Sequence, residues 1–220
     1  LGGASGRPWT TATVAVGNFD GVHRGHQDLV RSAVEHARQA AQAAVVLTFD
    51  PHPAEVLSEG RSLPRLTRLP ARAAILQSLG VDFVAVVDFS AALASLSPGE
   101  FCKDVLVGEL AAQWVVVGEG FRFGASRSGD VSALRALGTL YGFGVEERPG
   151  VLYRGEVISS SRVRAALAAG NTDEAWALCG RPFRLEGEVV HGEGRGRLLG
   201  MPTANLATST QDAIPAPGVY

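Results

Sequence analysis

Short apolar runs separated by helix-length segments are the feature that most limits how this chain can fold. The runs expected to be strands lie at residues 12–16, 44–49, 82–87, 114–117 and 144–147. Segments with helical spacing are predicted over residues 28–44, 71–79, 97–112 and 131–141. Crossovers of helical length join parallel strands. The pattern therefore predicts a doubly wound α/β fold, in which helices cover both faces of a parallel sheet.

The pattern changes after Gly180. Residues 183–191 alternate like a half-exposed strand, a glycine-rich turn follows, and residues 204–207 are again strand-like. No helical pattern returns before the last residue. We therefore predict two domains, 1–180 and 181–220, of which the second is the start of a small β domain. The chain begins with leucine and stops in strand-like sequence, so we expect both ends to be those of a fragment.

Charge and apolar content argue against several classes of function. The formal charge is −2, whereas proteins that bind nucleic acid usually carry a basic excess. No apolar run reaches the ~20 residues that span a bilayer, and the first residues lack the basic start and apolar core expected of a signal peptide. We expect a cytoplasmic protein without a nucleic-acid or membrane partner, and the sequence leaves a homo-oligomer open. Cys102 and Cys179 are far apart in sequence, which favours two buried, inert thiols.

The first strand runs into a turn, residues 17–26, that precedes a helix. In open α/β sheets ligands bind beyond the carboxyl ends of strands, and a helix start offers free N–H groups to an anion. His23 and His26 share a face of the first helical turn, while Gly21 and Gly25 let a nucleotide approach the backbone. The turn suits nucleotidyl transfer, in which an ionised phosphate attacks and the enzyme stabilises charge on phosphates. A histidine pair at this spacing could instead bind a metal, but no third ligand is near.

Two further loops follow predicted strands and reach the same sheet edge. Asp50 and His52 lie in the segment 48–53, which could border the substrate or be a proline-stiffened turn. Arg122 and Arg127 lie in the loop after residues 114–117, where they could contact phosphate or form a solvated basic loop. The sheet edge is therefore expected to collect polar groups from several elements.

Three consecutive serines, residues 159–161, open a predicted helix and precede Arg164. Serine at a helix start is usually an N-cap, and this explanation suffices for one of the three. Hydroxyls followed by a guanidinium also suit a departing pyrophosphate.

Several blocks together resemble bacterial bifunctional FAD synthetases. Residues 23–26 resemble the His-x-Gly-His signature of nucleotidylyltransferases, and the run 17–27 is typical of these synthetases. The other matching blocks are 48–53, 117–124 and 158–164, and then 187–192 and 196–206, which resemble the opening of riboflavin kinase. The resemblance covers the chain from about Thr13 onward and implies a Rossmann-like nucleotidylyltransferase domain followed by part of a β-barrel domain.

The resemblance implies transfer of AMP from ATP to FMN, giving FAD and pyrophosphate, with Mg²⁺ required. The implied catalytic residues are Asn18, His23, His26 and Arg164. Implied ATP or phosphate contacts are Gly17, Phe19, Asp20, Gly25, Gly118, Gly120, Ser159, Ser160 and Ser161. Asp50, His52, Phe121 and Arg122 are implied on the flavin side. The full protein would also phosphorylate riboflavin to FMN.

In the kinase-like segment, the signature Pro202-Thr203-Ala204-Asn205 implies that Thr203 and Asn205 help to hold Mg²⁺ and ATP. The family's catalytic glutamate and most of its kinase flavin pocket come after the position of Tyr220, so we expect this kinase site to be incomplete and inactive.

The chain departs from the family pattern in two places. Related enzymes have Asn or Asp, which contacts the nucleotide, where this chain has Gly120, and loss of such a contact costs ~1–3 kcal/mol. Ser161 replaces a threonine and keeps the hydroxyl. Two alternatives stay open. One is a nucleotidylyltransferase for another phosphorylated acceptor, which the kinase-like tail disfavours. The other is a flavin- or nucleotide-binding regulator without catalysis, which Gly120 alone favours.

Overall fold

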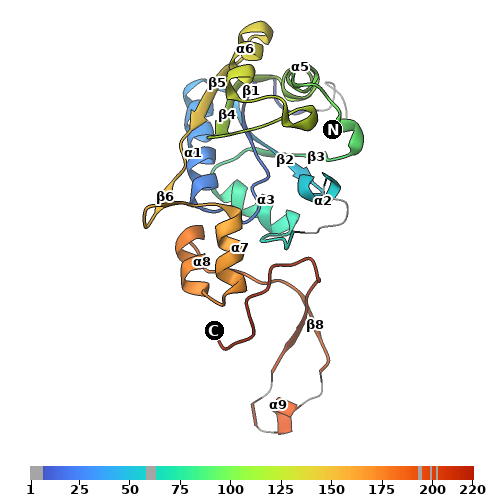
Figure 1. Cartoon of the computed structure of the whole chain (residues 1–220), viewed down its shortest axis with the longest axis vertical. Coiled ribbons are helices and arrows are strands. Elements are labelled where there is room, and N and C mark those ends of the chain that lie inside the picture. The colour runs from blue at the N-terminus through green and yellow to red at the C-terminus, as the bar shows by residue number, and fades with distance from the viewer. Residues whose placement is uncertain (1–6, 58–62, 193–194, 199, 202) are drawn as a thin grey trace.

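The computed structural model describes residues 7–57, 63–192, 195–198, 200–201 and 203–220. Its centre is a five-stranded sheet in the order β3-β2-β1-β4-β5 (Figure 1), and every pairing in it is parallel. The strands are β1 (Ala12–Val16), β2 (Ala43–Asp50), β3 (Phe83–Asp88), β4 (Ala112–Gly118) and β5 (Gly144–Arg148). The order reverses between β1 and β4, which is where doubly wound folds bind ligands. The predicted fold class is confirmed.

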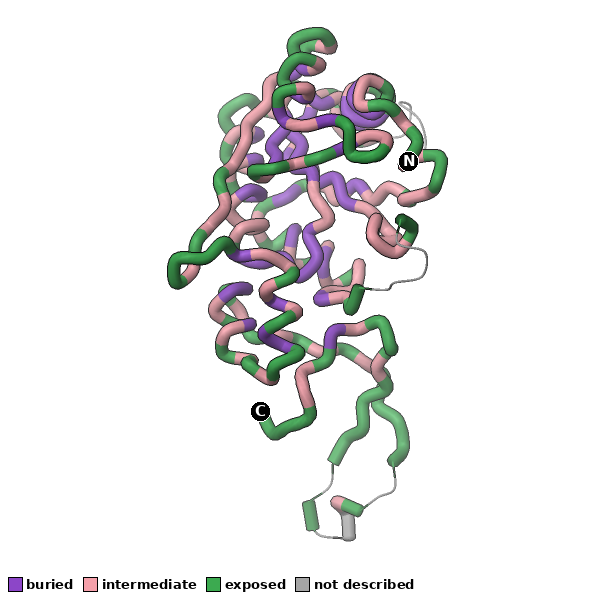
Figure 2. Tube along the Cα trace, viewed as in Figure 1, coloured by how far each residue is buried: buried purple, intermediate pink, exposed green. Residues whose placement is uncertain are grey.

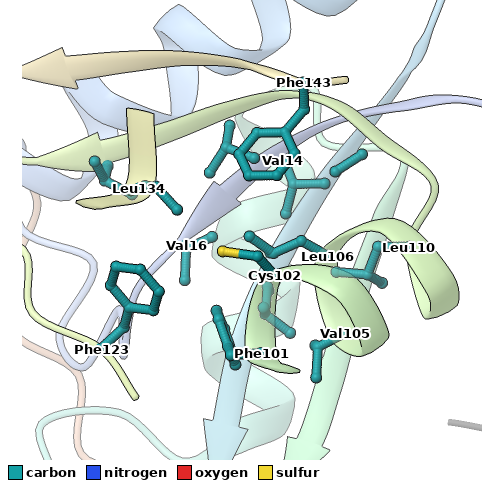
Figure 3. Close-up of a cluster of buried hydrophobic side chains, with 14 of the residues drawn as sticks. Val14, Val16, Phe101, Cys102, Val105, Leu106, Leu110, Phe123, Leu134 and Phe143 are labelled. Atoms are coloured by element: carbon teal, nitrogen blue, oxygen red, sulfur yellow. The ribbon is translucent and has the colours of Figure 1, made fainter. Parts of the chain in front are cut away.

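Helices cover both faces of the sheet because successive strand residues point to opposite sides. Val14 and Val16 of β1 belong to the core under η1 (Phe101–Glu109, a π-helix) and α6 (Val131–Tyr141), as Figure 3 shows. Ala15 lies in the opposite core with residues of α1 (Arg24–Gln39) and α3 (Leu69–Ser78). Figure 2 shows the buried residues concentrated along these strands. Cys102 and Cys179 are both buried, as expected.

The described chain also contains short elements between and after these. They are α2 (Pro53–Leu57), α4 (Ala91–Ala94), α5 (Pro98–Glu100), the 3₁₀ turn η2 (Ala125–Arg127), β6 (Leu152–Tyr153), β7 (Glu156–Val157), α7 (Ser160–Ala168), α8 (Thr172–Cys179), β8 (Glu188–Val190), α9 (Arg195–Leu198) and β9 (Asn205–Ala207). Helices α7 and α8 contact each other and enclose a third apolar cluster below the sheet (Figure 1).

Two helices differ most in their bounds from the sequence-based prediction. Helix α1 begins at Arg24, not near residue 28, because His23 caps it. The helix ends at Gln39, and two residues later the backbone of Ala41 is left-handed, with a φ of 54°. The helix predicted over 97–112 opens with the expected capping box at Ser97 but ends at Glu109. A positive φ of 49° at Ala111 then turns the chain into β4. The strands that follow these two helices, β2 and β4, therefore begin earlier than their apolar runs suggested.

The segment after Gly180 forms a two-stranded antiparallel hairpin that projects from the rest of the chain (Figure 1). Its strands β8 and β9 are exposed along their whole length (Figure 2). The short helix α9 near its tip corrects the expectation that no helix returns after Gly180. The described residues of this segment close no barrel. The predicted domain boundary near Gly180 stays a prediction.

Candidate active site

The turn between β1 and α1 lies at the carboxyl edge of the sheet, beside the point where the strand order reverses. Its start is fixed to β2 by a hydrogen bond from Gly17 N–H to Leu47 O, 3.1 Å long. Its end is fixed by His23, whose Nδ1 accepts from the N–H of His26 at 3.3 Å. A Cβ at Gly25 would lie 3.2 Å from the His23 ring, a tight contact that would shift the ring by a few tenths of an ångström, so glycine favours this packing. The sequence-based explanation, close approach of a nucleotide, is not the only reason for that glycine.

His23 and His26 form a stacked pair with ring centroids 3.6 Å apart. Burial lowers the pKa of His23 to about 4, against the opposing effect of nearby Asp20. Burial also holds the pKa of His26 well below its usual range, and the neighbouring His23 adds to this effect. Both imidazoles are therefore neutral at pH 7. Because Nδ1 of His23 accepts a hydrogen bond, its ring proton is assigned to Nε2, which can donate to a ligand.

One nitrogen of the pair is unsatisfied. Nδ1 of His26 is buried and has no hydrogen-bond partner in the described part of the chain. An unpaired buried polar atom costs ~1–3 kcal/mol and is a feature that functional sites tolerate.

Side chains from several elements hold the carbonyl oxygens of the turn. Asn18 O accepts from Thr48 Oγ1 of β2 at 3.0 Å and from an Nη of Arg72 of α3 at 2.9 Å. Asp20 O accepts from Ser160 Oγ of α7 at 2.8 Å. The Asn18 carboxamide itself makes no hydrogen bond to a described residue. It is therefore free to act as predicted, whereas the hydroxyl of Ser160 is already used inside the protein.

Asp20 corrects one expectation from the sequence. Its side chain is 4% exposed and pairs with Arg164 at 2.5 Å. The same carboxylate accepts from the N–H groups of Leu66 and Thr67, which lie just before α3. A buried carboxylate with these partners ties α3 and α7 to the turn and would repel a phosphate. Its predicted contact with ATP is therefore not supported.

The side chain of Phe19 does not fit the implied contact with ATP or phosphate. The ring is fully buried, and a Cβ at Gly17 would lie 3.2 Å from it. It also meets the ring of His26 edge-on at 5.2 Å. The ring thus packs against His26, and only the backbone of Phe19 can face a ligand in the turn.

The serine cluster divides into different roles. Ser159 caps α7 by accepting from Arg162 N–H at 3.2 Å, which confirms the N-cap expected of one serine. Ser160 holds the turn, as described above, and Ser161 is exposed at the start of the helix. Arg164 donates through Nε to Pro64 O at 2.7 Å and through one Nη to Asp20. Its other Nη makes no hydrogen bond to a described residue and can still donate to an anion.

Helix α3 carries a cation, Arg72, that reaches the loop after β2 and was not predicted from the sequence. Arg72 is 4% exposed, and its guanidinium lies 3.9 Å from the Asp50 carboxylate. Burial lowers the pKa of Arg72, and its Nε has no hydrogen-bond partner among described residues. Nδ1 of His52 accepts from Ala54 N–H at 3.1 Å, and burial lowers the pKa of His52. A charged residue within the largely apolar sequence of α3 was the available signal.

The loop after β4 brings Gly118 and Gly120 to the same edge. Gly120 has a φ of 71°, and a Cβ built on it meets nothing within 4 Å. Asn is among the non-glycine residues that best tolerate this conformation, so the family's Asn would fit here. Phe121 stacks on Phe123, and the exposed Arg122 lies 3.8 Å from Asp130 in a surface ion pair. The loop therefore offers open space where the family places a polar side chain.

The predicted kinase residues lie apart from this site, on the projecting hairpin. Thr203 and Asn205 are both exposed. A Cβ at Gly192 would overlap the Asn205 carboxamide, and one at Gly196 would lie 3.0 Å from Thr203 Oγ1. The two polar side chains thus pack over the glycine turn. Pro202 of the same motif is outside the described residues.

Within the described ranges, no three His, Cys, Asp or Glu side chains are placed to share a metal ion, so the alternative of a metal-binding histidine pair gains no support. No helix among the described residues has the length and apolar character needed to cross a membrane.

Comparison with known families matches both parts of the chain. A family model described as FAD synthetase matches residues 7–162, and one described as riboflavin kinase matches residues 179–220. The chain belongs to the FAD synthetase family. The turn with the histidine pair and the loops after β2 and β4 all lie within the residues that match the FAD synthetase model.

Curated relatives are described as enzymes that combine the two activities. A bifunctional riboflavin kinase/FMN adenylyltransferase of Escherichia coli K12 is 40% identical over 97% of this chain and 68% of its own length. One from Pseudomonas fluorescens is 41% identical with the same coverage. A solved structure titled a macrolide-efflux protein from Streptococcus pneumoniae has a TM-score of 0.84 and 34% identity, over 98% of this chain and 69% of that one. This last likeness extends the shared fold across nearly the whole chain.

Proposed function

We propose that this chain transfers the AMP group of ATP to the phosphate of FMN, which forms FAD and releases pyrophosphate. The observation that carries the proposal is the neutral, stacked pair of His23 and His26 at the start of α1, beside the reversal of strand order. The FMN phosphate is already an anion, so the reaction needs no strong base. It needs donors that stabilise charge on the α-phosphate and on the leaving pyrophosphate, and neutral imidazoles can supply them.

The roles follow from the free donors of the turn. Nε2 of His23 and the carboxamide of Asn18 would hold the triphosphate, together with the N–H groups at the start of α1. Ser161 and the unused Nη of Arg164 would bind the pyrophosphate end, while the pair with Asp20 keeps Arg164 in place. His23, through its capping bond, and Arg164, through its pair with Asp20, are fixed before substrate arrives, which is what transition-state stabilisation requires.

FMN would lie at the turn, between the loops after β2 and β4. Asp50 and His52 come from the first loop, and Phe121 and Arg122 from the second. These loops flank β1 in the sheet order, so an acceptor between them would have its phosphate near the His23 side of the turn.

Mg²⁺ is expected to accompany the nucleotide. The described residues form no dedicated cation site, and protein-bound Mg²⁺ commonly has one or two carboxylates plus substrate phosphates as ligands. The residues present therefore fit an ion carried by ATP phosphates better than one held by the protein alone. When bound, the ion would neutralise phosphate charge. For the kinase-like segment, Thr203 and Asn205 are the proposed ligands of a site that we expect to be inactive in the 220-residue chain. ATP and FMN as substrates also favour a cytoplasmic location.

The direct test is incubation with ATP, Mg²⁺ and either FMN or riboflavin, followed by separation of the flavins. We expect FAD from FMN and little FMN from riboflavin. His23→Ala should lower kcat at least about 10²-fold, whereas His191→Ala, which changes an exposed histidine of the hairpin, should not. Absence of FAD would refute the adenylyltransferase proposal, and robust FMN production would refute the expectation of an inactive kinase site.

A further inference from the structure

One side chain from the riboflavin kinase-like segment reaches the candidate active site. Arg181 follows Gly180, which ends α8, and lies within the kinase match and outside the FAD synthetase match. Its guanidinium donates to Gly21 O at 2.6 Å and to Val22 O at 2.9 Å. It also donates to Cys179 O at 3.3 Å, so it bridges the end of α8 and the catalytic turn.

One of the two carbonyls that Arg181 holds belongs to a strained residue. Val22 has a φ of 36°, whereas the φ of 83° at Gly21 is ordinary for glycine. Positive φ is a genuine outlier for a β-branched residue such as valine. Such a conformation persists only where surrounding contacts enforce it. Charge-assisted hydrogen bonds from a guanidinium are contacts of this kind.

The hydrogen bond from Arg181 to Val22 O also fixes the direction of the following N–H, which belongs to His23. A trans peptide is planar, and its C=O and N–H point in opposite directions, so the His23 N–H points away from Arg181. No described residue accepts a hydrogen bond from that N–H. Gln27 Nε2 donates to the same Val22 O at 2.9 Å and to Cys179 O at 2.7 Å, which strengthens the restraint. The peptide before His23 is therefore held from behind by two side chains.

We propose that Arg181 is a positioning residue for adenylyl transfer, which holds the carbonyls of Gly21 and of the strained Val22 so that His23 and its N–H face the triphosphate. The segment that opens the kinase-like part of the chain thereby completes the adenylyltransferase site. This inference rests on the proposed function. Arg181 is partly buried beside the histidine pair, and its charge adds to burial in lowering the pKa of His23 and of His26.

The test compares Arg181→Met and Arg181→Lys with Arg184→Met. Arg184 is a matched control because it lies in the same segment, its side chain is 83% exposed, and its ion pair with Glu186 is loose at 4.0 Å. We expect Arg181→Met to lower kcat for FAD formation about 10- to 100-fold, with the KM for FMN changed less than about twofold. The lysine variant should recover part of this loss, since it can hold one carbonyl. Arg184→Met should stay within about twofold of the parent.

A second readout separates positioning from general stability. Assays are run below the melting temperature of every variant, and NMR follows the amide and imidazole signals of His23. Arg181→Met should shift the His23 amide signal and raise the pKa of its ring. A folded Arg181→Met variant with kcat within about twofold of the parent, or with unchanged His23 signals, overturns the inference. If the parent chain makes no FAD, the proposed function fails, while the NMR shift still reports whether Arg181 positions His23.

Discussion

Acidification should destabilise the folded chain through His23. The pKa of this residue is about 4 in the folded state because it is buried, whereas an unfolded histidine has its ordinary value of 6.5. As the pH falls below 6.5, the unfolded chain takes up the proton first, so the stability falls through the window from 6.5 to 4. Above about pH 7 both states are neutral at this position and no penalty exists.

The size of the effect follows from the same two values. The gap between about 4 and 6.5 corresponds to about 3 kcal/mol once the pH is below 4, at roughly 1.4 kcal/mol per pH unit. By pH 5 the loss should already be about 2 kcal/mol. His23→Asn is the matched variant because Asn is a good N-cap, can accept from His26 N–H and does not titrate.

The assay is urea unfolding of both proteins at pH 7 and pH 5, with NMR titration of the imidazole signals. Other carboxylates and histidines contribute to both proteins, so the difference between them isolates His23. The parent should lose about 2 kcal/mol more than the variant between the two pH values. Equal losses, or a His23 ring that titrates near 6.5 in the folded chain, would show that the buried neutral pair is wrong.

Three substitutions test other parts of the site. Gly120→Asn should fold normally, because the left-handed position of residue 120 faces open space, and it should lower the KM for ATP up to about tenfold. Nucleotide binding without turnover in both the parent and the variant would instead favour the regulator alternative. Gly25→Ala should reduce kcat at least about tenfold, since its Cβ would push on the His23 ring from 3.2 Å, and full activity would remove the packing role of this glycine. Asp20→Asn should lower the free energy of unfolding by about 3 kcal/mol, as measured by urea denaturation, because it leaves the partly buried guanidinium of Arg164 without its carboxylate partner. A loss below about 1 kcal/mol would contradict the structural role of Asp20.

The sheet and its covering helices could be predicted from the sequence because they depend on local periodicity. Strand β1 and helix α6 have the predicted bounds, and the capping box at Ser97 forms as predicted. The start of α1 could not be predicted in this way, since histidine is not among the usual N-cap residues. His23 takes that role because stacking on His26 holds its Nδ1 over the first helical turn.

The motif predicted the histidine pair of the site but not the residues that hold the turn in place. The sequence places His23 and His26 on one helical face, but it does not show which partners lie behind the turn. Arg72 and Arg181 meet the turn from 54 and 159–160 residues away. Contacts at such separations depend on tertiary packing, and neither residue lies in a pattern that marks a ligand site. The buried pairing of Asp20 could not be predicted for the same reason, because its partners before α3 and in α7 become neighbours only in the folded chain.

The arrangement of charge around the turn explains how a chain with a net charge of −2 can form a phosphate site. Arg72, Arg164 and Arg181 each bond a carbonyl or carboxylate of residues 18–22, so three guanidinium groups lie behind the turn. In the proposed site the neutral imidazoles would act as donors, Arg72 and Arg181 would supply a positive field from behind the turn, and Arg164 would keep one Nη for the pyrophosphate. In a water-poor site such fixed charges act more strongly than exposed ones. The proposed affinity for phosphate would thus be set by where a few cations are held, which overall composition does not reveal.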